Sequence, residues 1–214
     1  LEAFFKQYLE DDFQLSPMRA TRLGAHRFDA QLDDVSAKAL ERRSDLTRRT
    51  LEQLPQKVDY QKLSRDSQVD FEILRDSLKL DLWLDETEQP WQNDPRIYTG
   101  LATDCAYALL TQSTQPRETN IRNAIARIKL VPALLRSSRE NLRRPPRIRT
   151  ETAIQQNKGA IAFYETELRR LIGDSPQRGE GQAAAKGAIQ ALRQQQVFLE
   201  DQLLPLSTSD WRIG

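Results

Sequence analysis

Residues 117–146 read RETNIRNAIARIKLVPALLRSSRENLRRPP, and this stretch decides the fold class. Its large apolar side chains recur every three or four residues, which is the period of one face of an α-helix. The stripe consists of Ile121, Ile125, Ile128, Val131 and Leu135. Pro132 lies within the stripe, and because the apolar period continues across it, the pattern predicts one helix with a kink near Pro132. The Pro145-Pro146 pair ends that helix.

The helical period extends from this stretch toward both ends of the chain, and alternating strand patterns are scarce. The sequence therefore predicts an all-α fold of seven or eight helices in an irregular helical bundle. The segment that follows Ser64 carries two apolar stripes, one through Val69, Ile73, Leu80 and Leu84 and one through Phe71, Leu74, Leu78 and Leu82. Two stripes predict a helix that packs on two sides.

Two connecting segments interrupt the helical pattern. Residues 87–98 contain Pro90, Asn93, Asp94 and Pro95, and this composition predicts a loop. Residues 173–181 hold three glycines and a proline, which predicts a mobile linker. Because no motif recurs at a fixed spacing, residues 1–214 are expected to form a single helical domain.

The composition excludes several classes of chemistry. The chain has 32 basic and 31 acidic residues, a net charge of +1, and this balance argues against a nucleic-acid partner. One cysteine cannot form a disulfide within the chain, and one histidine cannot form a two-histidine zinc site, so neither a metal nor another cofactor is expected here. No apolar run has the roughly 18 to 20 residues of a membrane helix, so no transmembrane segment is expected.

A few polar and aromatic residues lie in connections or at helix ends. His26 is either a general base or substrate donor oriented by Asp29 or Asp33, or a loop histidine that fixes a turn. Cys105 has helical apolar neighbours and is expected to pack in the core. Trp91, Asn93, Tyr98 and Asn141 either cap helices on the core or line a cleft.

Charge is distributed unevenly along the chain. Six arginines lie between Arg136 and Arg149, opposed by Glu140 alone, whereas residues 81–94 are acidic. Such patches form a partner surface, an internal network of ion pairs, or two solvated faces.

Several motifs carry a family resemblance. They are residues 15–26 (LSPMRATRLGAH), Trp91 with Asn93, Pro95 and Tyr98, the residues Val131-Pro132, Arg139, Asn141-Leu142 and Pro145-Pro146, and residues 203–207 leading to Trp211-Arg212-Ile213-Gly214. In this order they resemble the N-terminal half of the bacterial domain of unknown function 885 family, whose members are described as lipoproteins. The similarity spans nearly the whole chain, and the series is more specific than any one motif.

The resemblance implies a function that the residues alone do not. Full-length members resemble helical zinc metallopeptidases, with a His-Glu-x-x-His helix in the C-terminal half. The chain would then be a non-catalytic N-terminal portion of such a hydrolase, forming one wall of a peptide-binding cleft. Its partners would be a peptide substrate and the C-terminal half, which would hold the zinc. A bacterial envelope or periplasmic location follows from the resemblance only, and a truncated product is favoured over a short relative that has lost catalysis.

The resemblance also directs attention to substrate-binding candidates, which are His26, Trp91, Asn93, Tyr98, Arg139, Asn141 and Arg143. Arginines among them would bind a peptide carboxylate bidentately. No catalytic or metal-ligating residue is expected in this chain. The alternative is a stand-alone helical protein-interaction module that uses the Arg-rich and acidic patches.

Overall fold

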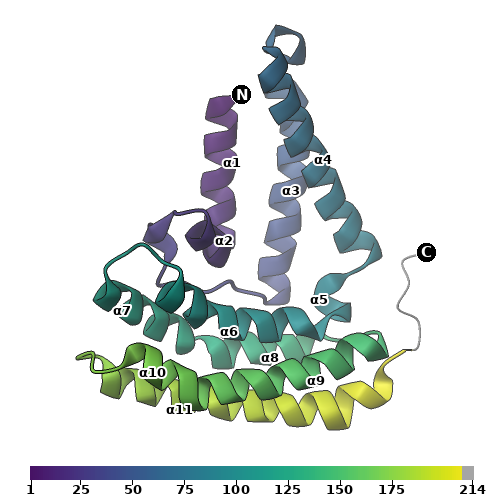
Figure 1. Cartoon of the computed structure of the whole chain (residues 1–214). Helices are drawn as coiled ribbons and strands as arrows, with labels where there is room; N and C mark the ends of the chain where they lie inside the picture. Colours follow the sequence, from purple (N-terminus) through teal and green to yellow (C-terminus); the bar gives the residue numbers. More distant parts are fainter. Residues whose placement is uncertain (209–214) are drawn as a thin grey trace.

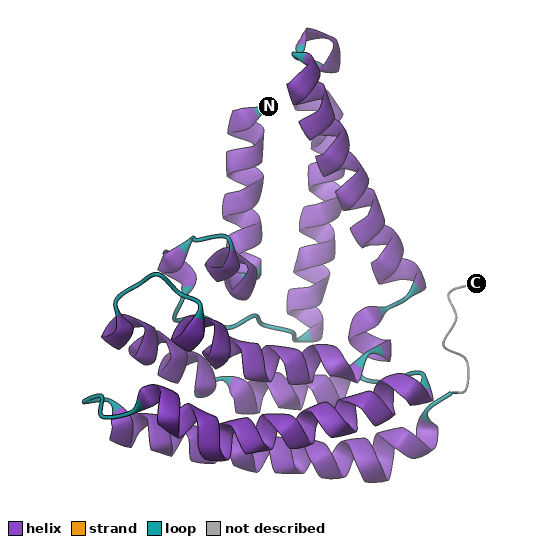
Figure 2. Cartoon of the chain, in the orientation of Figure 1, coloured by secondary structure: helices purple, strands orange, loops and turns teal. Residues whose placement is uncertain are grey.

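A computed structural model of the chain describes residues 1–208, and the family motif at Trp211 to Gly214 lies outside them. Helices dominate this range, and no β-strand occurs within it, which confirms the all-α prediction (Figure 2). One group of helices lies side by side as a base, and long helices rise from one side of it (Figure 1). Among the described residues, no helix combines the length and apolar character needed to cross a membrane.

The base contains the main hydrophobic core. Its helices are α6 (Pro95–Thr111), α7 (Arg117–Ile128), α8 (Val131–Asn141), α9 (Arg147–Ala162), α10 (Leu168–Ile172) and α11 (Arg178–Val197). The predicted stripe is confirmed, because Ile121, Ile125, Ile128, Val131 and Leu135 are each at most 2% exposed. Small residues let α11 approach its neighbours closely: a Cβ on Gly181 would lie 2.6 Å from the Ile172 Cδ1 atom.

Two helices of the base contain wide π-helical turns. One turn, η3 (Phe163–Glu167), joins α9 to α10, and another, η4 (Phe198–Leu203), follows α11 and leads into the 3₁₀ turn η5 (Leu204–Leu206). Tyr164 lies in η3, where it is buried and donates a 2.6 Å hydrogen bond to the carbonyl of Ala102 on α6. The wide turn thus carries a core contact.

The remaining elements form an upper region. They are α1 (Glu2–Leu15), α2 (Pro17–Arg22), η1 (His26–Phe28), α3 (Ala37–Lys57), η2 (Tyr60–Lys62), α4 (Arg65–Thr87) and α5 (Pro90–Asn93). We call α1, α3 and α4 the pillars. Helices α1 and α4 both pack on α3, which lies between them (Figure 1). Near the free ends of α3 and α4, Leu54, Val58 and Phe71 form a small separate core.

The prediction that α4 packs on two sides is wrong within residues 1–208. Phe71 and Leu78 of one stripe are buried, but Ile73 and Leu80 of the other are 60% and 53% exposed. The pillars stand clear of the base over most of their length, so α3 covers one face of α4 and no described element covers the opposite one. An amphipathic period shows that a face is apolar, but it does not supply a neighbour.

Two boundary predictions also need correction. The segment around Pro132 does not form one kinked helix, because α7 ends at Ile128 and α8 begins at Val131. Pro132 lies in the first turn of α8, where the missing backbone N–H of proline costs no helical hydrogen bond. Residues 87–98 are mostly helical, because Pro90 and Pro95 begin α5 and α6 in the same way. The predicted helical bundle is confirmed, with a number of helices close to the predicted seven or eight within residues 1–208 once short segments such as α5 are set aside.

The predicted linker at 173–181 is shorter than expected. It spans only Gly173 to Gln177, since α11 already begins at Arg178. Gly173 ends α10 with a φ of +56°, a conformation that glycine adopts easily. Ser175 is buried, and its hydroxyl donates a 2.6 Å hydrogen bond to Glu118 on α7. The connection is therefore fastened to the base.

Candidate functional site

A groove of about 490 Å³ opens between α1 and α4. Helix α3 forms its floor, and α5 with the C-terminal end of α8 closes its lower end. The polar and aromatic residues that line it include Tyr8, Asp12, Arg19, Glu41, Arg43, Asp81, Asp85, Trp91, Asn141 and Arg143. Three of the predicted site residues, Trp91, Asn141 and Arg143, therefore meet at one hollow although they are up to 52 positions apart in sequence.

Trp91 is held in place at the lower end of the groove. Its indole lies edge to face with the Tyr98 ring at 5.8 Å, and the Arg43 guanidinium carbon lies 5.4 Å from its ring centre. Arg43 is itself fixed, because its Nη2 atom lies 3.0 Å from Asp33 Oδ2 and donates a 2.7 Å bond to the Leu15 carbonyl. The groove therefore has a preorganised aromatic wall.

Tyr98 and Asn141 support that wall from below. The Tyr98 hydroxyl is buried and donates a 2.6 Å hydrogen bond to the Trp91 carbonyl. Asn141 Nδ2 donates to the Tyr98 hydroxyl at 3.1 Å and to the Val35 carbonyl at 2.7 Å. Burial raises the pKa of Tyr98 to about 12, so the hydroxyl keeps its proton and remains a donor. These two residues position the groove, and Tyr98 itself is too buried to touch a ligand.

Asn93 and Arg139 lie outside the groove. Asn93 Nδ2 donates a 2.9 Å hydrogen bond to the Glu88 carbonyl, so it fixes the turn before α5. Arg139 Nη1 donates to Gln195 Oε1 at 3.1 Å and thereby joins α8 to α11. Arg143 is exposed beside the groove and donates a 2.6 Å bond to the Glu140 carbonyl. Of the predicted arginines at positions 139 and 143, only Arg143 reaches the site.

Two carboxylates of the groove were missed by sequence reasoning. Asp12 of α1 is 8% exposed, and Arg19 Nη1 lies 3.1 Å from its Oδ2 atom. Burial raises the pKa of Asp12, and the negative charges of Asp33 and Asp81 raise it further. Burial also raises the pKa of Asp81 of α4, with a smaller contribution from Asp85. Asp81 belongs to the acidic stretch seen in the sequence, but nothing in the sequence pairs it with Asp12.

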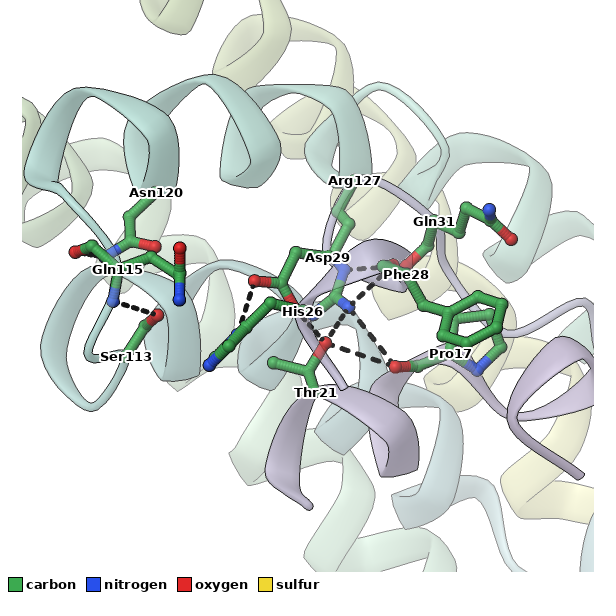
Figure 3. Close-up of polar contacts among 10 residues, drawn as sticks. All are labelled: Pro17, Thr21, His26, Phe28, Asp29, Gln31, Ser113, Gln115, Asn120 and Arg127. Atoms are coloured by element: carbon green, nitrogen blue, oxygen red, sulfur yellow. Dashed lines mark hydrogen bonds and ion pairs between the residues drawn. The ribbon is translucent and has the colours of Figure 1, made fainter. Parts of the chain in front are cut away.

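His26 lies elsewhere, in a polar network beside α7 (Figure 3). Its Nδ1 atom is 2.9 Å from Asp29 Oδ2, and Asp29 Oδ1 accepts a 2.6 Å hydrogen bond from the Thr21 hydroxyl. The buried Arg127 donates to Thr21 Oγ1 at 2.5 Å and to the Gln31 carbonyl at 2.7 Å. The network ties α2 and η1 to the base. The structure thus places Asp29 against His26, which is the contact named in the first of the two readings made from the sequence, within a network that also holds the turn.

His26 also lines a separate hollow of about 300 Å³, which Gln112 and Ser113 border. Cys105 is fully buried, and burial raises the pKa of its thiol to about 11, so it stays protonated in the core. Within residues 1–208, no three His, Cys, Asp or Glu side chains are grouped as a metal site would need. The groove is therefore the strongest candidate site in the part of the chain that the structure describes.

Comparisons with known proteins agree with this fold. Residues 17–214 match the family model described as "Bacterial protein of unknown function (DUF885)". No curated protein matches the sequence. A solved structure, described as "a putative lipoprotein of unknown function from Shewanella oneidensis", is similar with a TM-score of 0.83 and 22% sequence identity. The match covers 93% of this chain and 37% of that one, so the chain spans little more than a third of its neighbour's length. The chain belongs to the bacterial DUF885 family.

Proposed function

We propose that this chain is the non-catalytic helical wall of a peptide-binding cleft in a metallopeptidase-like protein. The observation that carries the proposal is the groove between α1 and α4, where Trp91, Asn141 and Arg143 meet carboxylates of the pillars. The family resemblance supplies the reaction class, and the groove supplies a place for the substrate.

The lining of the groove suits a peptide. Leu40, Leu84 and the Trp91 ring offer apolar surface, while Asp85 and Arg143 offer charge. A peptide carries apolar side chains next to polar backbone groups and charged ends, so it needs both kinds of surface. A volume of about 490 Å³ falls within the roughly 300 to 1,000 Å³ range of small-ligand pockets and suits a few residues of a peptide.

The hydrolytic chemistry is assigned to another part of the full-length protein. In zinc peptidases the metal polarises the scissile carbonyl and activates water. The described residues of this chain hold no group of three ligands for such an ion, so no step of hydrolysis is assigned to them. Their role in the proposal is to bind the peptide and orient it.

A matched pair of tryptophan substitutions tests the proposal. Ala37 lines the groove and is exposed, so Ala37→Trp should fill the groove without disturbing the core. Ala133 is exposed on α8 outside the groove, and Ala133→Trp is the control. A casein digest is passed over each immobilised chain, and retained peptides are identified by mass spectrometry. Wild type and the control should retain a common set of peptides, and Ala37→Trp should lose it. Equal retention by Ala37→Trp, or no retention by wild type, would contradict the proposal.

The alternative of a stand-alone interaction module has less support. Arg149 of the Arg-rich stretch and Glu88 of the acidic stretch form an ion pair at 3.0 Å, with both side chains under 20% exposed. Arg147 pairs with Glu151 at 2.8 Å. The structure thus uses part of both patches for internal ion pairs, which leaves less charge for a partner.

A further inference from the structure

The charges of the groove do not balance. Four carboxylates line it, those of Asp12, Glu41, Asp81 and Asp85, against the guanidinium groups of Arg19, Arg43 and Arg143. Arg43 is paired with Asp33, which lies outside the groove lining, so its charge is already compensated. Arg143 donates to the neutral carbonyl of Glu140 and keeps its charge, so Arg19 and Arg143 are left against four carboxylates. The groove therefore carries an excess of negative charge.

Arg19 is the cation that both Asp12 and Asp81 share. Its positive charge lowers the pKa of each carboxyl, yet burial outweighs this effect and both pKa values remain raised. Burial raises the pKa of Tyr8, which borders the same groove, and the negative charges of Asp12 and Asp81 raise it further. Asp12 on α1 and Asp81 on α4 therefore border the same groove and share the charge of Arg19, while Arg43, which is paired with Asp33, also lowers the pKa of Asp12.

Asp12 also has an unsatisfied oxygen. Its Oδ2 atom is buried and accepts no hydrogen bond from the described residues. The Arg19 Nη1 atom lies 3.1 Å away but outside hydrogen-bond geometry, and Asp12 itself is more than nine-tenths buried at the groove. A buried charged acceptor without a donor is costly, so a ligand that brings a donor and a positive charge gains both interactions.

We propose that the groove recognises a primary ammonium group, which binds between the carboxylates of Asp12 and Asp81. An ammonium group is a compact positive charge with three donors, which matches one buried acceptor and one opposing carboxylate. The proposal rests on the proposed function in one respect: if the ligand is a peptide, the ammonium is its N-terminus or a lysine side chain. It replaces the expectation that arginines hold a peptide carboxylate.

Three synthetic peptides and one amine test the proposal by calorimetry at pH 7.5. The peptides are Ala-Phe-Ala-Ala, its N-acetylated form, and N-acetylated Lys-Phe-Ala-Ala, and the amine is phenethylamine. We expect the acetylated alanine peptide to bind about tenfold or more weakly than the free one, as for loss of a charged hydrogen bond. The acetylated lysine peptide separates the two sources of the ammonium group. If it binds as tightly as the free alanine peptide, the groove accepts a lysine side chain; if it binds as weakly as the acetylated alanine peptide, the groove recognises the N-terminus.

Carboxamide variants locate the effect. Asp81→Asn should weaken the free peptide and phenethylamine about tenfold while leaving the acetylated alanine peptide unchanged. Asp76→Asn is the matched control, because Asp76 lies on the same helix, is exposed, pairs with Arg75 and does not line the groove. Asp81 is itself on the surface, so its variant is expected to fold, and a circular-dichroism melt verifies this.

The outcomes separate the two proposals. Equal binding of the free and acetylated alanine peptides would overturn ammonium recognition and leave the peptide cleft standing. Binding of phenethylamine that depends on Asp81, with no peptide bound, would support ammonium recognition and contradict the peptide cleft. If neither amine nor peptide binds, or if Asp76→Asn weakens binding as much as Asp81→Asn, the ammonium proposal is wrong.

Discussion

The base and the pillars of this molecule are built differently. In the base, helices α6 to α11 share one large core, and buried polar side chains join them. For example, Gln195 donates to Ser138 at 3.0 Å and Asn157 donates to the Leu192 carbonyl at 2.9 Å. In the pillars, the separate core consists of Leu54, Val58 and Phe71 with a few half-buried neighbours. One region is packed on several sides, and the other mainly on one.

The base therefore provides most of the stability of the fold, and the pillars provide most of the groove. The groove lies between elements that are weakly packed, and its lower end rests on Tyr98 and Asn141 of the base. Binding surfaces are commonly drawn from the less stable parts of a protein, because buried charge and unpaired polar groups cost stability. We therefore expect substitutions in the base to unfold the molecule and substitutions in the pillars to act locally.

The largest effect is expected at the junction of the two regions. Arg127→Met should lower the free energy of unfolding by about 3–5 kcal/mol, because it leaves the carbonyls of Gln31 and Phe28 without their buried donor and removes the positive charge near the buried Asp29. Urea denaturation followed by circular dichroism measures the change. Arg122→Met, an exposed position on the same helix, should change it by no more than about 0.5 kcal/mol. Similar losses in both variants would mean that the network does not join the two regions.

A smaller and local effect is expected near the free ends of α3 and α4. Phe71→Ala removes the largest member of the small core and its edge-to-face contact with Tyr60, whose ring centre is 5.3 Å away. We expect a loss of about 2 kcal/mol, below the 3–5 kcal/mol of a phenylalanine in a large core, because few neighbours are present. Hydrogen exchange should speed up in residues 50–75 and stay unchanged in the base. Faster exchange throughout the base would show that the regions unfold together.

The smallest effect concerns Asp12 and depends on pH. Because burial raises the pKa of Asp12 in the folded chain above its ordinary value of 3.8, the folded state binds the proton more tightly than the unfolded state. Stability from this group therefore rises as the pH falls through the raised pKa toward 3.8. Asp12→Asn removes the penalty and should stabilise the chain by about 1 kcal/mol at pH 7, with the gain vanishing near pH 3.5.

Thermal melts across this pH range check the Asp12 prediction. Asp11→Asn is the control, because Asp11 is the neighbouring carboxylate and its contact with Gln7 is exposed. A destabilised Asp12→Asn at pH 7 would mean that the ion pair with Arg19 outweighs the burial of the carboxylate. A gain in stability together with weaker amine binding would instead show that the pillars give up stability for recognition.

Part of this structure could be predicted from the sequence, and the reason lies in periodicity. The stripe from Ile121 to Leu135 is buried because its spacing fixes one helix face whatever the neighbours are. The break at residues 129–130 could not be predicted, since the same spacing fits one bent helix or two helices joined by a tight turn. The unpartnered face of α4 escaped prediction for a related reason: spacing identifies a face but not what covers it.

The candidate site shows the same limit. Trp91, Asn141 and Arg143 were identified as candidates and do meet at the groove, whereas His26, Asn93 and Arg139 serve turns and helix contacts. Asp12 was missed because it is one of four acidic residues on α1, and nothing in the local sequence distinguishes it from Glu2, Glu10 and Asp11. Asp12 matters for the groove because Asp81 borders the same space, and Asp81 lies 69 positions further along the sequence. No local sequence pattern indicates that the two residues meet.

The wide turn η3 determines where the helix formed by α9 and α10 tolerates the deletion of a residue. Buried Ala160, Tyr164, Leu168 and Ile172 recur every four residues, and in a regular α-helix each such step would overshoot a full revolution by about 40°. The turn at Phe163–Glu167 absorbs the overshoot, since it accommodates one additional residue in the winding. Deleting one residue inside it should restore ordinary winding with both flanks still in phase. The same deletion one turn earlier in α9 would rotate everything after it by about 100° and carry Leu168 out of the interior.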